Sequence, residues 1–431
     1  MSNTHIKDHY DQEVPSLSGG NYQQYRWFGN EVQRVNFTLT KDVITKHLLV
    51  VGHFKAQNIL EIGPGPGTWT EVLLERFPGA QFTLVDISEQ MLKQASERLV
   101  SRGNFNFINH DFTNFEVQIP FDLVFSSRAI EYAEDKVAFI NNLARCLTLG
   151  GTGFVITKTP HYFRDRLLFR HIPLRHQRQL SLRQFKRLVK ASGLTVLGAY
   201  PVTISVPFFH SAKLNLWMSK ILTYLPLNFL TLNFVESYAL KFAKQEVVEV
   251  FGLPGSGKTT YAKDLESQGY ERIKVRTKWE LIKYNFIFLF YYPTKFVSGL
   301  WYLIIYAGQP RWWYYKLMNL FFQHNAKFIK AQGFARAVID QGHFQNLLSL
   351  FDYEQSAIKL KKYAKHLPQP TELVILTLDK GERQKRLNYR PRLPREELGL
   401  DNHNWAIVAE HHFAMVKDLV DKLGFPKYSL K

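Results

Sequence analysis

Residues 59–73 read ILEIGPGPGTWTEVL, and this stretch decides the fold of the first half of the chain. An apolar segment of strand type, 58–62, runs into glycines at alternate positions, Gly63, Gly65 and Gly67, and a helical pattern follows over 69–76. Glycine adopts left-handed backbone conformations and lets a ligand approach the main chain closely. A glycine-rich turn between a strand and a helix therefore predicts an α/β domain with a ligand site at the turn.

The alternation of strand and helix continues along the chain. Further elements are expected over residues 82–86, 88–101, 105–109, 121–126, 134–147 and 153–158. Ser88 is expected to cap the helix at 88–101, and Ser181 and Gly193 to begin and end a later helix before a strand, TVLGAY. Such alternation predicts a mostly parallel sheet built from βαβ units.

Acidic residues end the next two expected strands. Asp86 follows the glycine-rich turn by about 20 residues, the spacing of an acid that accepts hydrogen bonds from ribose hydroxyls. Asp111 and Phe112 end the third strand, where a carboxylate can meet an adenine amine and a ring can pack on the base. These residues predict a nucleoside-containing ligand.

The chain resembles the class I S-adenosylmethionine-dependent methyltransferases over roughly residues 20–205. The matching motifs are EIGPGPG at 61–67, LVDIS at 84–88, HDF at 110–112, FDLVFS at 121–126 and LTLGGTGFVIT at 147–157. The resemblance implies a Rossmann-like domain that binds S-adenosylmethionine, and a dinucleotide-binding Rossmann domain is the alternative. It assigns the methionine part to Glu61, Gly63, Gly65 and Gly67, the ribose to Asp86, the adenine to Asp111 and Phe112, and the sulfonium to Ser126 or Ser127.

The methyl acceptor is less clearly indicated. Glu131, Tyr132 and His161 are candidates near it. A basic stretch, 164–190, lies in the segment that covers the acceptor pocket in this family, which favours an acceptor bearing phosphate or carboxylate; solvated helix faces are the alternative. Its cations are Arg164, Arg166, Arg170, Arg175, Arg178, Arg183, Lys186, Arg187 and Lys190.

A second glycine-rich loop begins the second half. Residues 247–265 read VVEVFGLPGSGKTTYAKDL and contain a complete G-x-x-x-x-G-K-T pattern between a strand and a helix. In this pattern backbone N–H groups surround the phosphates, Lys258 reaches the β and γ oxygens, and Thr259 ligates Mg²⁺. The predicted ATP-binding residues are Gly252, Gly255, Ser256, Gly257, Lys258, Thr259 and Thr260.

Two further features predict phosphoryl transfer. Asp340 ends a strand expected at 335–340, where a carboxylate can act on Mg²⁺ or on an acceptor hydroxyl. Arg383, Arg386 and Arg390 share one helix face, and with the strand at 372–378 before them they resemble the arginine lid of small P-loop kinases.

Residues 245–431 thus resemble the nucleoside-monophosphate-kinase-like group, thymidylate kinases especially. The resemblance implies a P-loop α/β kinase domain with catalytic Lys258, Asp340, Arg386 and Arg390. Thymidylate kinases tend to have Asp-Arg where this chain has Asp340-Gln341-Gly342. The aromatic region 276–333 favours a lipid-linked or amphipathic acceptor over a small nucleotide.

The predicted organisation is a methyltransferase domain at 1–205, an apolar and aromatic linker at 206–244, and a kinase domain at 245–431. Residues 221–235 and 284–310 are too short or too interrupted to span a bilayer. Tryptophan, tyrosine and cationic residues flank them, so helices lying at a membrane surface and buried core helices are both open.

Composition bounds the partners. A net charge of +18 indicates an anionic partner, and one cysteine, Cys146, excludes an internal disulfide. No secretory signal is recognised, so a cytoplasmic protein is expected, with peripheral association at the inner face of the plasma membrane as a further hypothesis. Nucleic acid is not favoured, His411 and His412 do not predict a metal site, and the oligomeric state stays open.

The leading hypothesis is a bifunctional enzyme that phosphorylates and then methylates an anionic or membrane-linked acceptor, such as the terminus of a surface glycan. Modification of RNA ends is one alternative. In a third reading, the second domain is a nucleotide-gated regulator of the first.

Overall fold

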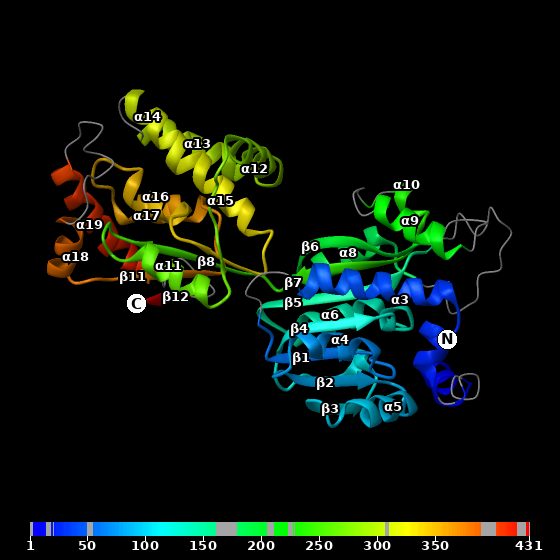
Figure 1. Ribbon diagram of the computed structural model, residues 1–431. Helices are drawn as coiled ribbons and strands as arrows, with labels where there is room; N and C mark the ends of the chain where they lie inside the picture. Colours follow the sequence, from blue (N-terminus) through cyan, green and yellow to red (C-terminus); the bar gives the residue numbers. More distant parts are fainter. Residues whose placement is uncertain are drawn as a thin grey trace. The chain divides into compact units, whose positions relative to one another are not determined.

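The computed structural model describes residues 3–13, 19, 21–49, 55–160, 179–204, 211–222, 227, 229–306, 310–388, 402–419 and 428–430. The chain divides into two compact units, Met1–Lys244 and Gln245–Lys431 (Figure 1). Each unit has its own sheet.

The first unit is built on a seven-stranded sheet with the order β3-β2-β1-β4-β5-β7-β6. Five strands are mutually parallel: β1 (Asn58–Ile62), β2 (Gln81–Asp86), β3 (Asn104–Asn109), β4 (Phe121–Ser127) and β5 (Leu147–Lys158). Strand β7 (Val235–Ala243) pairs antiparallel with β5 and with β6 (Thr195–Ile204). The predicted α/β fold is confirmed here, whereas the antiparallel strand β7 is an addition.

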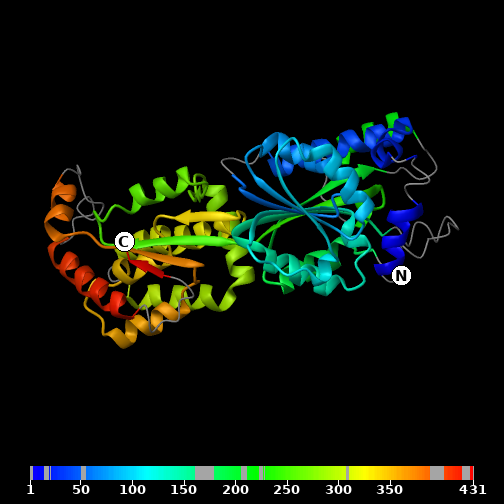
Figure 2. The ribbon, with the colours of Figure 1, turned by 90° about the horizontal axis from the view of Figure 1, so that it is seen from below.

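Helices cover both faces of this sheet (Figure 2). One apolar cluster joins the sheet to α3 (Glu31–Ile44), α4 (Thr68–Arg76) and α5 (Glu89–Leu99). A second cluster joins its other face to α6 (Lys136–Cys146) and α8 (Leu182–Ala191). The central strands β1 and β4 are buried from both sides, which is why their sequences are mostly apolar, whereas the edge strands β3 and β6 are only partly buried.

The expected caps are present. Ser88 accepts a hydrogen bond from the Met91 N–H at 3.1 Å and so begins α5. Ser181 and Gln184 form a capping box at the start of α8, and Gly193, with φ of 77°, follows its end. Side-chain oxygens at these positions satisfy backbone donors that have no partner inside the helix.

The prediction of a linker at 206–244 is wrong for most of the described residues in this range, because they form a helix and a strand of the first unit. Helix α9 (Ala212–Leu222) packs on β6 and α3, and β7 lies inside the sheet between β5 and β6. The first unit therefore extends to Lys244 rather than to residue 205. Pairing between segments so distant in sequence leaves no local pattern, which explains the error.

The N-terminal segment is also helical, which the sequence analysis does not predict. It contains α1 (Asn3–Asp8), the π-helical turns η1 (His9–Glu13), η2 (Gln24–Phe28) and η3 (Thr45–Leu49), and α3. Asn30 and Gln33 form a capping box at the start of α3.

The second unit has a five-stranded parallel sheet with the order β12-β11-β8-β10-β9. Its strands are β8 (Glu246–Gly252), β9 (Glu271–Arg272), β10 (Arg336–Ile339), β11 (Glu372–Leu376) and β12 (Tyr428–Leu430). Helix α11 (Lys258–Ser267) follows β8, as the sequence predicts. Other helices of this unit are α15 (Gln323–Ala331), α17 (Ala357–His366), α18 (Lys380–Asn388) and α19 (Asn402–Leu419).

Between β9 and β10 lie α12 (Lys278–Tyr291), α13 (Pro293–Tyr306), α14 (Pro310–Lys316) and the turn η7 (Leu317–Phe322). Within the residues described above, no helix has both the length and the apolar character needed to cross a membrane.

The two units share one arrangement at the centre of the sheet. In the first unit β1 lies between β2 and β4, and in the second β8 lies between β10 and β11. The connections from such a central strand go to opposite sides, which opens a crevice at its carboxyl end where ligands bind in open α/β sheets. Both glycine-rich loops lie at this end of their strand.

Candidate functional site

The first glycine-rich loop is held by tight backbone packing. Gly63, Gly65 and Gly67 have φ of 67°, 55° and 79°. A Cβ on Gly63 would lie 2.6 Å from that of Ala129, and one on Gly67 would lie 2.7 Å from Leu99 Cδ1. At Gly65 no atom lies within 4 Å of such a position. The outer glycines therefore fit the loop against the protein, and Gly65 leaves its open edge to a ligand.

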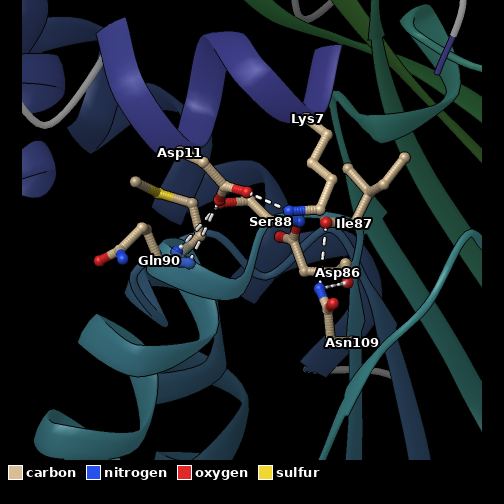
Figure 3. Close-up of polar contacts among 8 residues, drawn as sticks. Lys7, Asp11, Asp86, Ile87, Ser88, Gln90 and Asn109 are labelled. Carbon is tan, nitrogen blue, oxygen red and sulfur yellow. Dashed lines mark hydrogen bonds and ion pairs between the residues drawn. The ribbon is translucent and has the colours of Figure 1, made fainter. Parts of the chain in front are cut away.

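Asp86 lies beside this loop at the end of β2 (Figure 3). Its Oδ2 accepts a hydrogen bond from the Gly65 N–H at 3.2 Å, and its Oδ1 accepts one from the Ser88 N–H at 3.0 Å. Burial raises the pKa of the Asp86 carboxyl to about 6. The group is therefore mostly ionised at neutral pH and is a strong hydrogen-bond acceptor at the edge of the cavity.

A cavity of about 180 Å³ opens next to the loop. It brings together Gly63, Gly65, Asp86, Asp111 and Phe112, all of them predicted site residues. Phe112 is buried, with its ring centroid 4.8 Å from that of Phe139, and Asp111 Oδ1 accepts a hydrogen bond from the Thr113 N–H at 2.9 Å.

Two predicted residues lie behind the cavity rather than in its wall. Glu61 is 1% exposed, and its carboxylate accepts a hydrogen bond from Thr70 Oγ1 at 2.6 Å. Ser126 is fully buried and donates to the Ile62 carbonyl at 3.0 Å. Both side chains fasten β1 to its neighbours, whereas Ser127, the predicted alternative, lines the cavity.

Thr68 is a cavity residue that the sequence analysis misses. It is the first residue of α4 and is buried, and its Oγ1 has no hydrogen-bond partner among the described residues. Thr68 lines the cavity together with Gly65 and the ionised Asp86. A buried hydroxyl without a partner in the described part of the chain can bind a polar ligand at this place, such as a nucleoside with an amino-acid tail. The position of Thr68 directly after the glycine-rich loop is the sequence signal that could have identified it.

Residues 3–13 close one side of the cavity. Ile6 and Tyr10 contribute to its wall, and the Tyr10 hydroxyl donates to that of Tyr132 at 3.1 Å. Asp11 Oδ1 accepts a hydrogen bond from Ser88 Oγ at 2.6 Å, and Asp11 Oδ2 pairs with Lys7 Nζ at 2.5 Å (Figure 3). The segment is therefore tied to the cap of α5, directly beside Asp86.

Two arginines, Arg26 and Arg128, bring positive charge to the cavity wall. Arg128 has a left-handed backbone, φ 76°, and its Nε pairs with Glu131 Oε1 at 2.5 Å. Glu131 also accepts a hydrogen bond from the Lys158 N–H at 2.6 Å, so this predicted acceptor-site candidate positions Arg128 instead. Arg26 lies 4.4 Å over the ring of Trp27 and has no ion pair with any residue that the structure describes.

Tyr132, another acceptor-site candidate, lies in the cavity wall. His161 and the cations from Arg164 to Arg178 lie outside the described residues, as do Arg390 and its neighbours in the second unit.

Comparison with known proteins agrees with this geometry. The family model described as "Methyltransferase domain" matches residues 60–152, which contain the loop, Asp86, Asp111 and Phe112. The first unit contains a class I methyltransferase domain. The predicted Rossmann-like fold of this domain is thereby confirmed.

Two curated relatives match parts of the chain. Malonyl-[acyl-carrier protein] O-methyltransferase 1 of Ilyobacter polytropus is 36% identical over 104 residues, which are 24% of this chain and 39% of the relative. Trans-aconitate 2-methyltransferase of Acidovorax sp. (strain JS42) is 33% identical over 101 residues, 23% of this chain and 38% of the relative. The matched segment thus spans about two fifths of each relative's length.

Among solved structures, magnesium protoporphyrin IX methyltransferase from Synechocystis with bound SAH is similar with a TM-score of 0.41 and 15% identity. The similarity covers 56% of this chain and 99% of that one.

The second glycine-rich loop forms a cradle at the end of β8. Gly255 and Gly257 have φ of 84° and 91°, and Gly257 caps α11. A Cβ on Gly252 would lie 2.7 Å from Ser256 Oγ and 2.9 Å from the Leu376 carbonyl. Ser256 Oγ is buried and has no hydrogen-bond partner among the described residues, and Lys258 Nζ donates to the Gly252 carbonyl at 2.7 Å. These features fit a loop that surrounds phosphate.

A cavity of about 610 Å³ adjoins this cradle. Lys258, Lys327 and Arg386 line it, together with hydroxyl and amide side chains, and no carboxylate is among the described lining residues. The lining residues with hydroxyl or amide side chains are Ser256, Thr259, Thr260, Tyr315, Asn319, Gln323, Gln341, Gln345 and Ser349. The cavity is therefore cationic and suits an anionic ligand.

The structure places Asp340 outside this cavity wall. Asp340 pairs with Arg272 Nη2 at 2.8 Å and with Lys327 Nζ at 3.5 Å. Burial alone would raise the pKa of Asp340, but Lys327 and Arg272 outweigh it and hold the pKa below its usual value. In this arrangement Asp340 orients Lys327 toward the cavity, and its contact with Mg²⁺ stays a prediction.

The predicted arginine lid is only partly assembled. Arg386 lines the cavity, and its Nη1 lies 3.4 Å from where a Cβ on Gly257 would be. Arg383 pairs with Glu410 of α19 instead of lining the cavity. Among the described residues no cluster of three or more metal-binding side chains is found.

Proposed function

We propose that the first unit transfers a methyl group from S-adenosylmethionine to an anionic acceptor. The observation that carries the proposal is one cavity that joins the open edge of Gly65, the ionised Asp86, and Asp111 with Phe112. The match of residues 60–152 to a methyltransferase domain supports it.

The chain's own residues have binding and positioning roles in this proposal. Asp86 accepts hydrogen bonds from ribose hydroxyls, Phe112 packs on the base, and Thr68 supplies a hydroxyl to the methionine part. When bound, S-adenosylmethionine supplies a methyl group on a sulfonium, which is a good leaving group. The protein therefore needs chiefly to hold the acceptor in line and to exclude water.

Arg26 supports the anionic class of the acceptor. It lines the cavity without an ion pair among the described residues, whereas the neighbouring Arg128 is neutralised by Glu131. A half-buried cation without a counter-ion favours a carboxylate or phosphate ligand. The names of the two curated relatives denote acceptors that carry carboxylates.

Replacing Arg26 tests this assignment. With malonyl-acyl-carrier protein and trans-aconitate as acceptors, Arg26→Gln should raise KM about tenfold or more, because a charge-assisted hydrogen bond contributes about 1.5–3 kcal/mol. The Kd for S-adenosylmethionine should not change. Arg34→Gln, at an exposed position on α3, is the matched control. Equal KM values for Arg26→Gln and the unaltered chain would contradict the role of Arg26.

We further propose that the second unit binds a nucleoside triphosphate and transfers its terminal phosphoryl group. The supporting observation is the cradle of Gly255 and Gly257 beside Lys258 and Arg386 in a cavity whose described lining holds no carboxylate. Thr259 lies on the first turn of α11, where its hydroxyl would hold Mg²⁺. When bound, Mg²⁺-ATP supplies the phosphoryl group, and the cationic side chains stabilise its charge.

The hypothesis that methyl transfer and phosphoryl transfer act on the same acceptor is tested with labelled ATP and a labelled methyl donor. Extracts incubated with labelled ATP and a labelled methyl donor should show both labels in one lipid-extractable species if the acceptor is a membrane-linked glycan. Labels in RNA would favour end modification instead. A Lys258→Ala chain that retains methylation but loses phosphorylation supports a kinase, whereas ATP binding without turnover in the unaltered chain supports a regulator.

A further inference from the structure

Helices α12 and α13 of the second unit expose an unusual amount of apolar surface. The described part of the chain has 22 large apolar side chains that are exposed, and 10 of them lie on these two helices. A surface helix normally turns its polar face to solvent. Single exposed apolar residues need no explanation, but a concentration of this kind marks an interaction site.

The exposed residues form one stripe on each helix. On α12 they follow helical spacing and include Trp279, Ile282, Phe286 and Phe290; on α13 they are Val297, Trp301, Ile304 and Ile305. Trp279 is 80% exposed and Phe290 is 81% exposed. Both stripes are therefore open to solvent in the described structure.

The inner faces of both helices already have their partners. Asn285 of α12 donates to the Phe322 carbonyl at 2.9 Å, and the ring centroids of Phe288 and Phe328 are 6.3 Å apart. On α13, the centroid of Phe296 lies 4.9 Å from that of Phe321. Figure 1 shows α12 and α13 on the outer side of α15 and α17. The exposed stripes are thus the faces turned away from the unit's own core.

Charge around the stripes has one sign. Residues 274–306 contain five cationic side chains, Lys274, Arg276, Lys278, Lys283 and Lys295, and one carboxylate, Glu280. Glu280 is paired with Lys330 at 2.7 Å. The cations before α12 and Lys283 on it are exposed. These cations form no ion pair with any residue that the structure describes, and an apolar and aromatic face bordered by such cations is complementary to a bilayer with anionic headgroups.

Length decides how such helices would lie. Each has 14 residues, or about 21 Å at 1.5 Å per residue, less than the ~30 Å hydrocarbon core of a bilayer. We propose that α12 and α13 lie in the plane of an anionic membrane surface, with Trp279, Phe286 and Trp301 inserted among the headgroups. The chain that follows α13 supplies Asn319 and Gln323 to the cavity beside Lys258, so docking would bring that cavity close to lipid-borne acceptors.

Vesicle sedimentation with the full chain tests the proposal. Vesicles of phosphatidylcholine mixed with phosphatidylglycerol should bind the chain, and vesicles of phosphatidylcholine alone should bind it less. The double variant Trp279→Ser/Phe286→Ser should bind about tenfold or more weakly, because it removes two inserted rings. The matched control is Tyr353→Ser/Ile358→Ser, at equally exposed apolar positions of the same unit.

A charge variant keeps the test decisive if the apolar variant does not fold. Lys278→Glu/Lys283→Glu should lose the preference for phosphatidylglycerol. Melting curves establish that each variant is folded. Equal vesicle binding by both double variants and the unaltered chain would overturn the proposal, as would absence of binding. It would also be overturned if the unaltered chain were a dimer that Trp279→Ser/Phe286→Ser converts to a monomer, since a second copy would then cover the face.

Discussion

At the scale of single residues, Glu61 shows how a motif position can serve the fold rather than the ligand. Its place before the glycines suggests contact with the cofactor, yet its carboxylate is buried against Thr70. Burial raises the pKa of Glu61 to about 8. The folded chain therefore keeps a proton that the unfolded chain releases near pH 4.5.

The sign of the resulting pH dependence follows. Between about pH 4.5 and pH 8 the folded state holds more protons than the unfolded state, so this residue makes the chain less stable as the pH rises. Glu61→Gln should be more stable than the unaltered chain at about pH 8.5, by an amount on the order of a few kcal/mol, and similar to it at about pH 4. Thermal unfolding at the two pH values measures the difference.

The same variant separates the two roles of Glu61. If it only supports the loop, Glu61→Gln should bind S-adenosylmethionine within about threefold of the unaltered chain, since a neutral glutamine still accepts from Thr70. The contrary result would be a large loss of affinity for S-adenosylmethionine, together with a stability difference between Glu61→Gln and the unaltered chain that does not depend on pH. Glu61 would then be a ligand-binding residue.

At the scale of elements, residues 3–13 form an N-terminal cover over the cavity of the first unit. Asp11 ties it to Ser88 and Gln90, and Tyr10 ties it to Tyr132. Asp11→Ala should loosen residues 3–13 and raise the dissociation rate of S-adenosylmethionine about tenfold, because about 1–2 kcal/mol of hydrogen bonding to the cap is lost.

Hydrogen exchange of the segment and stopped-flow release of the ligand measure this effect. Asp8→Ala, at an exposed position of the same segment, is the matched control. Unchanged exchange and release in Asp11→Ala would show that the other contacts of the segment, including the Tyr10–Tyr132 hydrogen bond, hold it without Asp11.

The elements that the sequence predicts well are those with a local signal. Strand β1, the loop and α4 come from one short motif, and Ser88 marks the start of α5 by its own chemistry. Strand β7 and the N-terminal cover could not be found in this way. Their partners lie far away in sequence, β5 for the one and the α5 cap for the other, and neither segment carries a glycine or acid motif.

The site residues divide along the same line. Gly63, Gly65, Asp86, Asp111 and Phe112 are brought together as expected. Thr68 and Arg26 were missed because the sequence does not show that, among the described residues, the Thr68 hydroxyl has no hydrogen-bond partner and Arg26 has no ion pair. Asp340 was assigned a role in the reaction because it ends a strand. Its ion pairs with Arg272 and Lys327 join residues from other elements, so the sequence alone does not show them.

At the scale of the whole molecule, the division at Lys244 has a direct consequence. A fragment of residues 1–205 lacks β7, so it would leave β5 and β6 with unpaired edges, whereas 1–244 has the complete sheet. We expect 1–244 to be soluble and to unfold cooperatively, and 1–205 to aggregate, because exposed strand edges pair with other chains. Expression and thermal unfolding of the two fragments measure this, and cooperative unfolding of 1–205 would contradict the role given to β7.

The central claim is that one chain has two separate donor sites, each at a glycine-rich loop. Calorimetric titration of the full chain with S-adenosylmethionine and with Mg²⁺-ATP, in the unaltered chain and in Asp86→Asn and Lys258→Ala, tests it most directly. We predict that Asp86→Asn weakens S-adenosylmethionine binding about tenfold or more and leaves Mg²⁺-ATP binding unchanged, and that Lys258→Ala does the reverse. Failure of the unaltered chain to bind either ligand, or loss of both ligands in one folded variant, would contradict the claim.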